Sequence, residues 1–467
     1  MGHRGRQSVY CSTTMWRPNI GSRGNEPIYL AIVNCLMEAV HSGGLRAGSR
    51  LPTQRDLARA LGITVTTVTR AYAEAERRGL ISGEVGRGTF VRSSGLVACV
   101  EPGSDLIDLR TNSLPPYAHA QELMTSALSA LRADSANLFA YQPHAGAPAH
   151  RQAGAAWIER RGVAAPADRV IVTAGAQHAI TVTLAALTRA SDTVLTEALT
   201  YTGAKAVANH LQLRLEGLPV DGEGLIPDAL DAACRAGARV LYCMPTIQNP
   251  IASLMSEGRR REVTELAKQH DLLIIEDDSY GFHVPASTPL AALVPERTYF
   301  IASASKSLAP GLRVAFLLAP DGMTKRLEAA VFATTVMAPP ATAAMAAAWI
   351  NEGLADRVVE WKRNEIDARQ QIARRLFPER SIDGHASSPH LFVRLPEPWR
   401  AQDFAAHGRL RGVAVTMAEE FAAGRVTAPQ AVRVCLGPPT DRAVLERALT
   451  VLAELLTQAP QSDPATV

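Results

Sequence analysis

Apolar residues recur at helical spacing in the first part of the chain. Between residues 27 and 43 they fall three to four residues apart, which predicts a helix that a Ser-Gly-Gly run ends. Two shorter helices are predicted next, capped by Thr53 and Thr64 and separated by a glycine. The segment LISGEVGRGTFV then alternates like a β-hairpin. These elements predict a small helix-turn-helix head with a wing at residues 26–92.

From about residue 108 onward, short β-branched runs alternate with helical patterns. The runs are VIVT, TVLT, RVLYC, LLIIE, TYFIA and RVAFLL. Strands that alternate with helices predict an α/β body with a mostly parallel sheet covered on both faces. In such sheets functional groups gather at the carboxyl ends of the strands.

The composition is that of an ordinary globular protein, with 47% hydrophobic and 20% charged residues. A length of 467 residues predicts two or three domains. The longest charge-free stretch, residues 329–350, is mostly Ala and Thr and contains two prolines, so no membrane span is predicted. No apolar segment follows the opening MGHRGRQ, and we expect a cytoplasmic protein. Six scattered cysteines without a CxxC pair indicate neither disulfides nor a metal site.

The net charge of +3 is unevenly distributed. Residues 1–92 hold thirteen Arg and no Lys against six acidic residues, a net charge of +7, whereas the remainder carries −4. A basic head on a mildly acidic body favours a polyanionic partner for the head. On the second short helix, Thr66, Thr67 and Arg70 point away from the apolar positions and suit contacts with phosphates and base edges. A small structural bundle with solvated charges is the alternative.

Polar residues follow the predicted strands of the body in a pattern that suits a phosphorylated pyridine aldehyde. Such a group needs a lysine for a Schiff base, a carboxylate beside the ring nitrogen, donors at the phenolic oxygen and a phosphate site. Lys306 and Asp277 supply the first two. The remaining roles fall to Asn249 and Tyr280 at the phenolic oxygen, Tyr201 against the ring, and Gly175, Ala176, Gln177, Ser303, Ser305 and Arg313 at the phosphate. Singly, each has an ordinary structural explanation, such as a surface lysine or a helix cap.

The run from GGLRAGSRLPTQRDL to GEVGRGTFV resembles the DNA-binding head of GntR-type bacterial transcription regulators. This resemblance implies a winged helix-turn-helix that binds double-stranded operator DNA. The positions that fall where that family contacts DNA are Arg55, Thr64, Thr66, Thr67, Gly86 and Arg87. Val65 and Thr69 replace arginines of some relatives, so the operator sequence does not carry over.

The body resembles the fold-type I, class I/II aminotransferases. The motifs are YQPHAGAPAHR, TAGAQHAI, PTIQNP, EDDSYGF and SASASKSLAPGLR. The resemblance implies pyridoxal 5'-phosphate as cofactor, held as an internal aldimine by Lys306, with Asp277 at the pyridine nitrogen and Tyr201 as the stacking ring. It also implies that Arg433 clamps a substrate carboxylate and that Tyr141 reaches the partner's phosphate in a homodimer. The turn IQNPIAS departs from the commoner QNPTG.

A GntR-type head before an aminotransferase-like body is the arrangement of the MocR subfamily of transcription regulators, which the chain resembles. The resemblance implies a regulator that senses an amino compound or the cofactor itself. An active aminotransferase with a DNA-binding head stays open as the alternative. The predicted segments are a tail at 1–25, the head at 26–92, a linker at 93–107, a body at 108–460 with lobes at about 140–330 and 350–460, and a frayed tail at 461–467.

Overall fold

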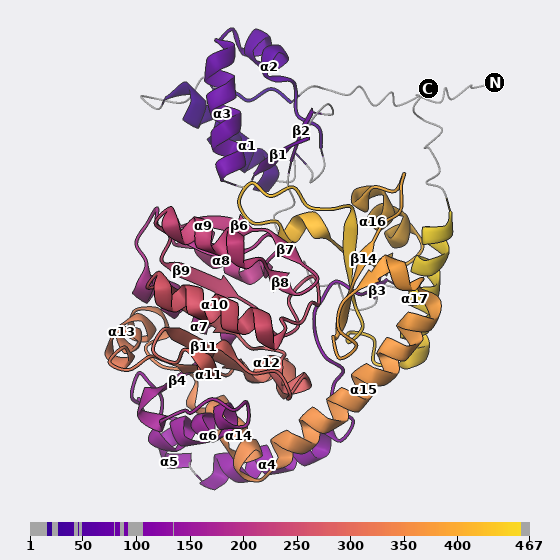
Figure 1. Cartoon of the computed structure of the whole chain (residues 1–467). Coiled ribbons are helices and arrows are strands. Elements are labelled where there is room, and N and C mark those ends of the chain that lie inside the picture. The colour runs from indigo at the N-terminus through magenta and orange to yellow at the C-terminus, as the bar shows by residue number, and fades with distance from the viewer. Residues whose placement is uncertain are drawn as a thin grey trace, which may run out of the picture. The chain divides into compact units, whose positions relative to one another are not determined.

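The computed structural model describes two compact units, shown in Figure 1. The first comprises residues 1–94 and is called the head, and the second comprises residues 95–467 and is called the body. The residues that the structure describes are 16–20, 27–41, 45, 49–78, 80–84, 88–91, 106–133 and 135–458.

The head is a three-helix unit with a β-hairpin, as predicted. Its elements are α1 (Ile28–His41), α2 (Gln54–Leu61), α3 (Val65–Arg77), β1 (Ile81–Glu84) and β2 (Gly88–Val91). Thr53 and Thr64 cap α2 and α3 by accepting hydrogen bonds from backbone N–H groups, and Gly62 ends α2 with a φ of 65°. One apolar core joins the helices, with Val68, Tyr72 and Ala75 buried in it. The hairpin tip, including Gly86 and Arg87, lies outside the described residues.

A seven-stranded sheet forms the centre of the large lobe in the described part of the body (Figure 1). Its strand order is β4-β12-β11-β10-β9-β5-β6, and β12 alone among them runs antiparallel to its neighbours. The bounds are β4 (Val170–Thr173), β5 (Thr193–Glu197), β6 (Arg214–Leu218), β9 (Val240–Cys243), β10 (Leu273–Asp277), β11 (Thr298–Ser303) and β12 (Ala315–Leu318). All six predicted runs are strands. The edge strand β6 was not predicted, because its sequence RLEGL is half exposed and lacks a β-branched run.

Helices cover both faces of this sheet, because successive strand residues point to opposite sides. Val170 and Val172 of β4 lie in one apolar cluster, and Ile171 between them lies in another. The helices of the large lobe and the segment leading to it are α4 (Ala120–Ala133), α5 (Ser135–Leu138), α6 (Pro148–Glu159), α7 (Ala176–Leu187), α8 (Thr202–His210), α9 (Pro227–Arg235), α10 (Glu257–Gln269), α11 (Leu290–Leu293), α12 (Ala304–Ser307), α13 (Thr324–Thr335) and α14 (Pro340–Asn351). A short ribbon pairs β7 (Val220–Asp221) with β8 (Gly224–Leu225). The predicted α/β fold class is confirmed.

The small lobe is a four-stranded sheet backed by helices. The sheet follows the order β13-β14-β17-β16, with bounds β13 (Ile382–Asp383), β14 (His390–Arg394), β16 (Thr416–Met417) and β17 (Ala431–Cys435). Its helices are α16 (Ala401–Leu410) and α17 (Arg442–Thr457). The parallel pair of β3 (Ile107–Asp108) and β15 (Val413–Ala414) joins the start of the body to this lobe.

The long helix α15 (Leu354–Leu376) connects the two lobes (Figure 1). Val358 near its start packs in the core of the large lobe, and Ala373 near its end packs in that of the small lobe. One continuous helix therefore couples the two cores. No helix in the described part of the chain is long and apolar enough to cross a membrane.

Candidate functional site

The predicted site residues of the body gather where the strands of the large sheet end. Gly175 follows β4, Tyr201 follows β5, Asn249 follows β9, Asp277 ends β10 and Lys306 follows β11. Four of these strands are parallel neighbours, so their carboxyl ends meet at one edge of the sheet. The topology thus places five residues from distant parts of the sequence around one region.

Lys306 stands in the short helix α12 with its side chain half-buried. Its Nζ atom donates a hydrogen bond to the carbonyl oxygen of Asn112, which the β3–β15 pairing brings in from the start of the body. Burial lowers the pKa of Lys306 to about 8, and the positive charge of Arg433 acts in the same direction. The amine is therefore much more often neutral near physiological pH than an ordinary lysine, which suits it to attack an aldehyde.

Asp277 is a buried carboxylate held by three donors. The Tyr242 hydroxyl donates to it at 2.9 Å, and Ser279 donates from its backbone N–H at 3.2 Å and from its hydroxyl at 2.5 Å. Burial raises the pKa of Asp277, and these hydrogen bonds oppose that effect. A buried carboxylate in this setting suits a buried cation such as a protonated pyridine nitrogen.

The elements around Gly175 form a polar cradle at the start of α7. Gly175 has a φ of 89°, and a Cβ atom there would fall 2.5 Å from Nη2 of Arg313. Arg313 in turn donates to the Ser305 hydroxyl at 3.2 Å, and Ser303 caps α12. Because the first N–H groups of a helix have no partner within it, the start of α7 beside a guanidinium suits a phosphate. The side chain of Gln177 is not part of this cradle, because its Nε2 donates to the carbonyl of Gly203 at 2.8 Å and its Oε1 can only accept hydrogen bonds.

Arg433 lies in β17 of the small lobe and reaches the large lobe. It donates from Nη1 to Oδ1 of Asn249 at 2.8 Å and from Nη2 to the carbonyl of Arg110 at 2.5 Å. Its guanidinium also lies 4.7 Å from the centre of the Phe421 ring. The buried Nε atom has no partner among the described residues, so the group retains a donor for an anion.

The three tyrosines predicted at the cofactor occupy different environments. Tyr201 precedes α8 and is partly buried. Its ring packs against Gly203, where a Cβ atom would fall 2.3 Å from it, so the position of the ring requires glycine there. Tyr280 is fully buried, and burial raises its pKa well above the ordinary value. Tyr141 is 87% exposed, so the chain's own fold leaves it on the surface.

Sequence reasoning missed three residues that support the site. Tyr242 and Ser279 hold Asp277, and Asn112 contacts Lys306. The Nδ2 atom of Asn112 lies 3.2 Å from Nδ1 of His390, whose Nε2 donates to the carbonyl of Gln248 at 3.2 Å. Burial lowers the pKa of His390 to about 3, so this ring is neutral. The position of Tyr242 near the end of an apolar run indicates that it lies close to the other strand ends of the site. Nothing in the sequence around Asn112 indicates its contact with Lys306.

In the head, the predicted DNA-contacting residues other than Gly86 and Arg87 lie on α2 and α3 or cap them. Arg55 and Thr66 are exposed. The hydroxyl groups of Thr64 and Thr67 lie 2.9 Å apart, because Thr64 also serves as the cap of α3. The guanidinium of Arg70 lies 4.0 Å from the centre of the Tyr29 ring, which fixes its direction.

Family comparisons agree with this division into head and body. Residues 104–452 match the family described as aminotransferase class I and II. The chain belongs to that family. Residues 28–91 match the bacterial regulatory proteins of the gntR family. The predicted combination of a GntR-type head and an aminotransferase-like body, typical of MocR regulators, is confirmed.

Individual relatives share either the whole arrangement or the body alone. The uncharacterized HTH-type transcriptional regulator YdeF of Bacillus subtilis is 30% identical over 451 residues, which cover 94% of this chain and 96% of YdeF. YjiR of Escherichia coli, which is likewise named as an uncharacterized HTH-type transcriptional regulator, is 26% identical over 358 residues, which cover 70% of this chain and 76% of YjiR. The crystal structure of an archaeal alanine:glyoxylate aminotransferase has a TM-score of 0.71 at 24% identity and covers 76% of this chain and 91% of its own. This structure shows the same fold.

Pyridoxal phosphate is the cofactor that the family implies, and the residues of the body fit it. Lys306 offers an amine of lowered pKa, Asp277 a buried carboxylate and Arg313 a cation beside the start of α7. The unpartnered Nε of Arg433 is a buried donor, and such an atom is costly unless a bound acceptor satisfies it. In the described residues no cluster of side chains suits a metal ion.

Proposed function

We propose that the chain is a MocR-type transcription regulator that acts as a cytoplasmic homodimer. Its head binds double-stranded operator DNA, and its body binds pyridoxal phosphate and senses a small amino compound or the cofactor itself. The observation that carries this proposal is the presence of a GntR-type head and a cofactor-competent aminotransferase body on one chain. YdeF, which is named as a transcriptional regulator, matches across both parts.

The head supports DNA binding through charge and exposed donors. Arg55 and Thr66 lie on the surface of two successive helices, which places a guanidinium and a hydroxyl where a helix-turn-helix meets DNA. The net charge of +7 in residues 1–92 favours a phosphate backbone. The operator sequence does not carry over from relatives that have arginines at the positions of Val65 and Thr69.

The side chains of the body would divide the work of sensing. Bound pyridoxal phosphate supplies an aldehyde that reacts with amines and a ring that withdraws electrons. Lys306 provides an amine that would compete with the amino compound for this aldehyde. Its lowered pKa lets it give up or accept a proton near neutral pH. Asp277 holds a positive charge at the ring nitrogen. Arg433 offers its unpartnered Nε to a carboxylate, so an amino compound that also carries a carboxylate fits best.

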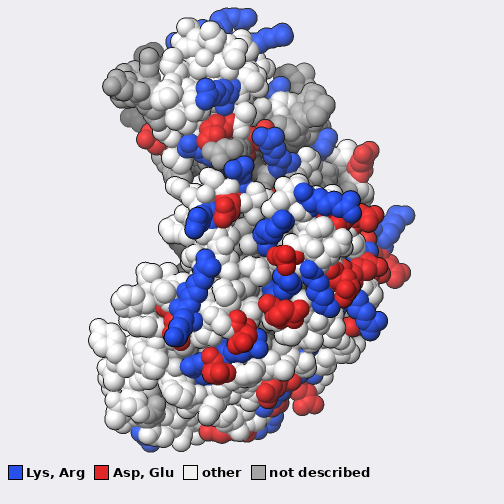
Figure 2. Space-filling view, turned by 60° about the vertical axis from the view of Figure 1, so that its left-hand side comes forward, with Lys and Arg blue, Asp and Glu red and all other residues white. Residues whose placement is uncertain are grey.

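Exposed apolar residues support the homodimer. Large apolar side chains at the surface of the described part of the body are Met124, Leu128, Phe139, Tyr141, Phe332 and Val336, and in the small lobe Leu410. His144 packs against Phe332 at 4.9 Å, so the segment after Tyr141 and helix α13 belong to one surface. On the face drawn in Figure 2, the lower left of the body bears few charged side chains. Exposed apolar surface of this kind marks protein interfaces.

The test measures DNA binding and the cofactor spectrum on the same full-length protein. Duplexes selected by the protein from a random-sequence library serve as the DNA probe, and fluorescence anisotropy gives the affinity. Lys306→Ala should abolish the visible absorbance of the protein-bound cofactor, whereas the matched variant Lys268→Ala, changed at an exposed lysine, should keep it. Retention of that absorbance in Lys306→Ala contradicts the assignment of Lys306. Failure to select any DNA contradicts the regulator.

The enzyme alternative makes a different prediction on the same samples. A sensor changes its spectrum and its DNA affinity with an amino compound and then stops after at most one equivalent of product per subunit. An aminotransferase converts many equivalents when an amino donor and a keto acid are both supplied. Sustained turnover without any change in DNA affinity would replace the regulator with the enzyme.

A further inference from the structure

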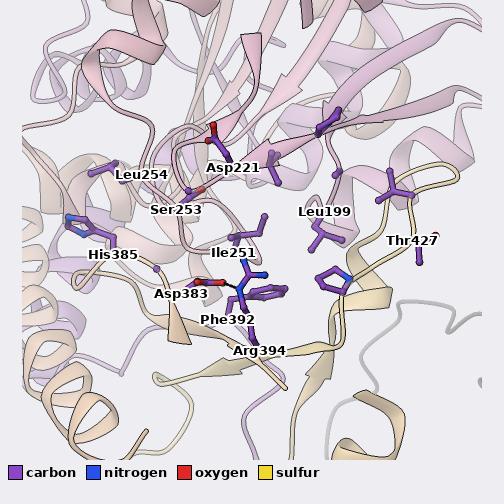
Figure 3. Close-up of a pocket in the computed structure, with 17 residues that line it drawn as sticks. Leu199, Asp221, Ile251, Ser253, Leu254, Asp383, His385, Phe392, Arg394 and Thr427 are labelled. Atoms are coloured by element: carbon purple, nitrogen blue, oxygen red, sulfur yellow. Dashed lines mark hydrogen bonds and ion pairs between the residues drawn. The ribbon is translucent and has the colours of Figure 1, made fainter. Parts of the chain in front are cut away.

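A cavity of about 660 Å³ lies between the two lobes of the body (Figure 3). Large-lobe residues such as Leu199 and Ile251 line one side, and small-lobe residues such as Phe392 and Arg394 line the other. None of the residues assigned to pyridoxal phosphate lines it. Its volume falls within the range of natural small-molecule sites.

The floor of the cavity is apolar. Leu199, Ile251 and Phe392 are buried members of one small cluster that also contains Phe421. The edge is held in shape by the backbone, because the N–H of His385 donates to the carbonyl of Ala252 at 2.8 Å. A Cβ at Gly384 would fall 2.5 Å from the side chain of Ala252, so the lobes touch closely at this point.

The polar side chains of the cavity lining include an ion pair between Arg394 and Asp383, beside Asp221, Ser253, His385 and Thr427. Arg394 donates from Nε to Oδ2 of Asp383 at 2.5 Å, and Figure 3 shows the guanidinium beside the Phe392 ring. The side chains are 57% and 34% exposed. The two Nη atoms of Arg394 and Oδ1 of Asp383 make no further hydrogen bond within the described part of the chain. A cationic edge and an anionic edge therefore face the cavity next to each other. Asp221, the other acidic residue of the lining, is already paired with Arg259 at 2.9 Å.

We propose that this cavity is a second small-molecule site that binds a zwitterionic amino acid with an apolar side chain. The carboxylate of the ligand pairs with the Nη atoms of Arg394, and its ammonium group pairs with Oδ1 of Asp383. The apolar side chain rests on Phe392 and Ile251. A ligand with only one of these charges leaves either the Nη atoms of Arg394 or Oδ1 of Asp383 without a partner.

Occupation of the cavity is coupled to the cofactor site through packed residues. Phe392 belongs to the same cluster as Phe421, and Arg433 lies over the Phe421 ring. Phe392 also stands opposite Arg433 in the β14–β17 ladder. A ligand that contacts both lobes favours the lobe arrangement to which it binds more tightly. The effect of this ligand on DNA binding rests on the proposed function, whereas binding of the ligand to the cavity does not.

The probe for this site is N,N-dimethyl-L-phenylalanine, a zwitterion whose tertiary amine cannot form a Schiff base. Isothermal titration calorimetry on the full-length protein loaded with cofactor should give one site per chain, without change in the visible spectrum. Arg394→Ala should weaken binding about tenfold, because a charge-assisted pair is lost. Arg375→Ala, which removes a comparable exposed ion pair elsewhere, should leave it unchanged. Thermal melts verify that both variants fold.

Three outcomes would overturn the proposal. One is the absence of binding at millimolar probe. Another is equal binding by Arg394→Ala and the unaltered protein. The third is equal affinity for N,N-dimethylphenethylamine or 3-phenylpropionate, each of which carries one charge. All three leave the assignment of the chain as a regulator intact.

Discussion

Arg433 donates from Nη1 to Oδ1 of Asn249 at 2.8 Å and so joins the small lobe to the large lobe beside the cofactor site. Arg433 keeps a second role available through its unpartnered Nε. Lysine has no planar fork and cannot hold the amide and a carboxylate in the same geometry. The contact therefore links closure of the lobes to recognition of a carboxylate.

Arg433→Lys should weaken the response to amino acids without preventing cofactor binding. We expect about tenfold weaker binding of alanine, because the bidentate pair with its carboxylate is lost. Ethylamine, which lacks the carboxylate, should bind with unchanged affinity. Titration of the visible absorbance of the loaded protein gives both values. Equal losses for alanine and ethylamine would show that Arg433 supports the site only through Asn249.

Gly175→Ala should weaken cofactor binding. The added methyl group meets Nη2 of Arg313 at 2.5 Å and disturbs the phosphate cradle. Gly322→Ala is the matched control, since Gly322 also has a positive φ, of 74°, but has open space around its Cβ position. Both variants should lose about 1 kcal/mol of stability from the backbone strain. Only Gly175→Ala should lower the affinity for pyridoxal phosphate, measured by fluorescence titration of cofactor-free protein. A similar loss in both variants would refute the role of the cradle.

The rate of cofactor capture should rise with pH around pH 8. The neutral amine attacks the aldehyde, and burial lowers the pKa of Lys306 to about 8. The neutral fraction therefore grows from about a tenth at pH 7 to about nine tenths at pH 9. Stopped-flow absorbance of cofactor-free protein mixed with pyridoxal phosphate measures this rate. A midpoint near pH 10 would mean that Lys306 is not shielded from water in the cofactor-free protein.

The ends of the large-sheet strands were predictable from sequence, and the contacts between lobes were not. Asp277 and Lys306 each follow a run of apolar residues, so local pattern and topology together place them at the same edge. Asn112 reaches Lys306 only because β3 pairs with β15, a contact across some 300 residues that no local pattern encodes. Strand β6 was missed because exposed edge strands need not be continuously apolar. Tyr141 is exposed, so its predicted role depends on a second subunit.

Arg55→Ala should weaken operator binding and reduce its salt dependence. Arg55 is exposed near the start of α2, where a guanidinium can reach a phosphate. The slope of log affinity against log salt should fall by about one contact. Arg189→Ala, which removes an exposed charge from the body, serves as the control and should keep the slope. Identical slopes for both variants would remove Arg55 from the interface.

The buried pair of Arg161 and Asp278 should contribute more to folding than any exposed pair. Their atoms lie 2.7 Å apart, and both side chains are at most 1% exposed. Asp278→Asn leaves the Arg161 charge without its counterion, so we expect a loss of about 3–5 kcal/mol in the free energy of unfolding. Arg375→Ala breaks an exposed pair with Glu446 and should cost less than about 1 kcal/mol. Urea denaturation of the cofactor-free proteins compares the two. Equal costs would mean that the oxygens of Val284, Pro285 and Ser287, which also accept hydrogen bonds from Arg161, stabilise its charge without Asp278.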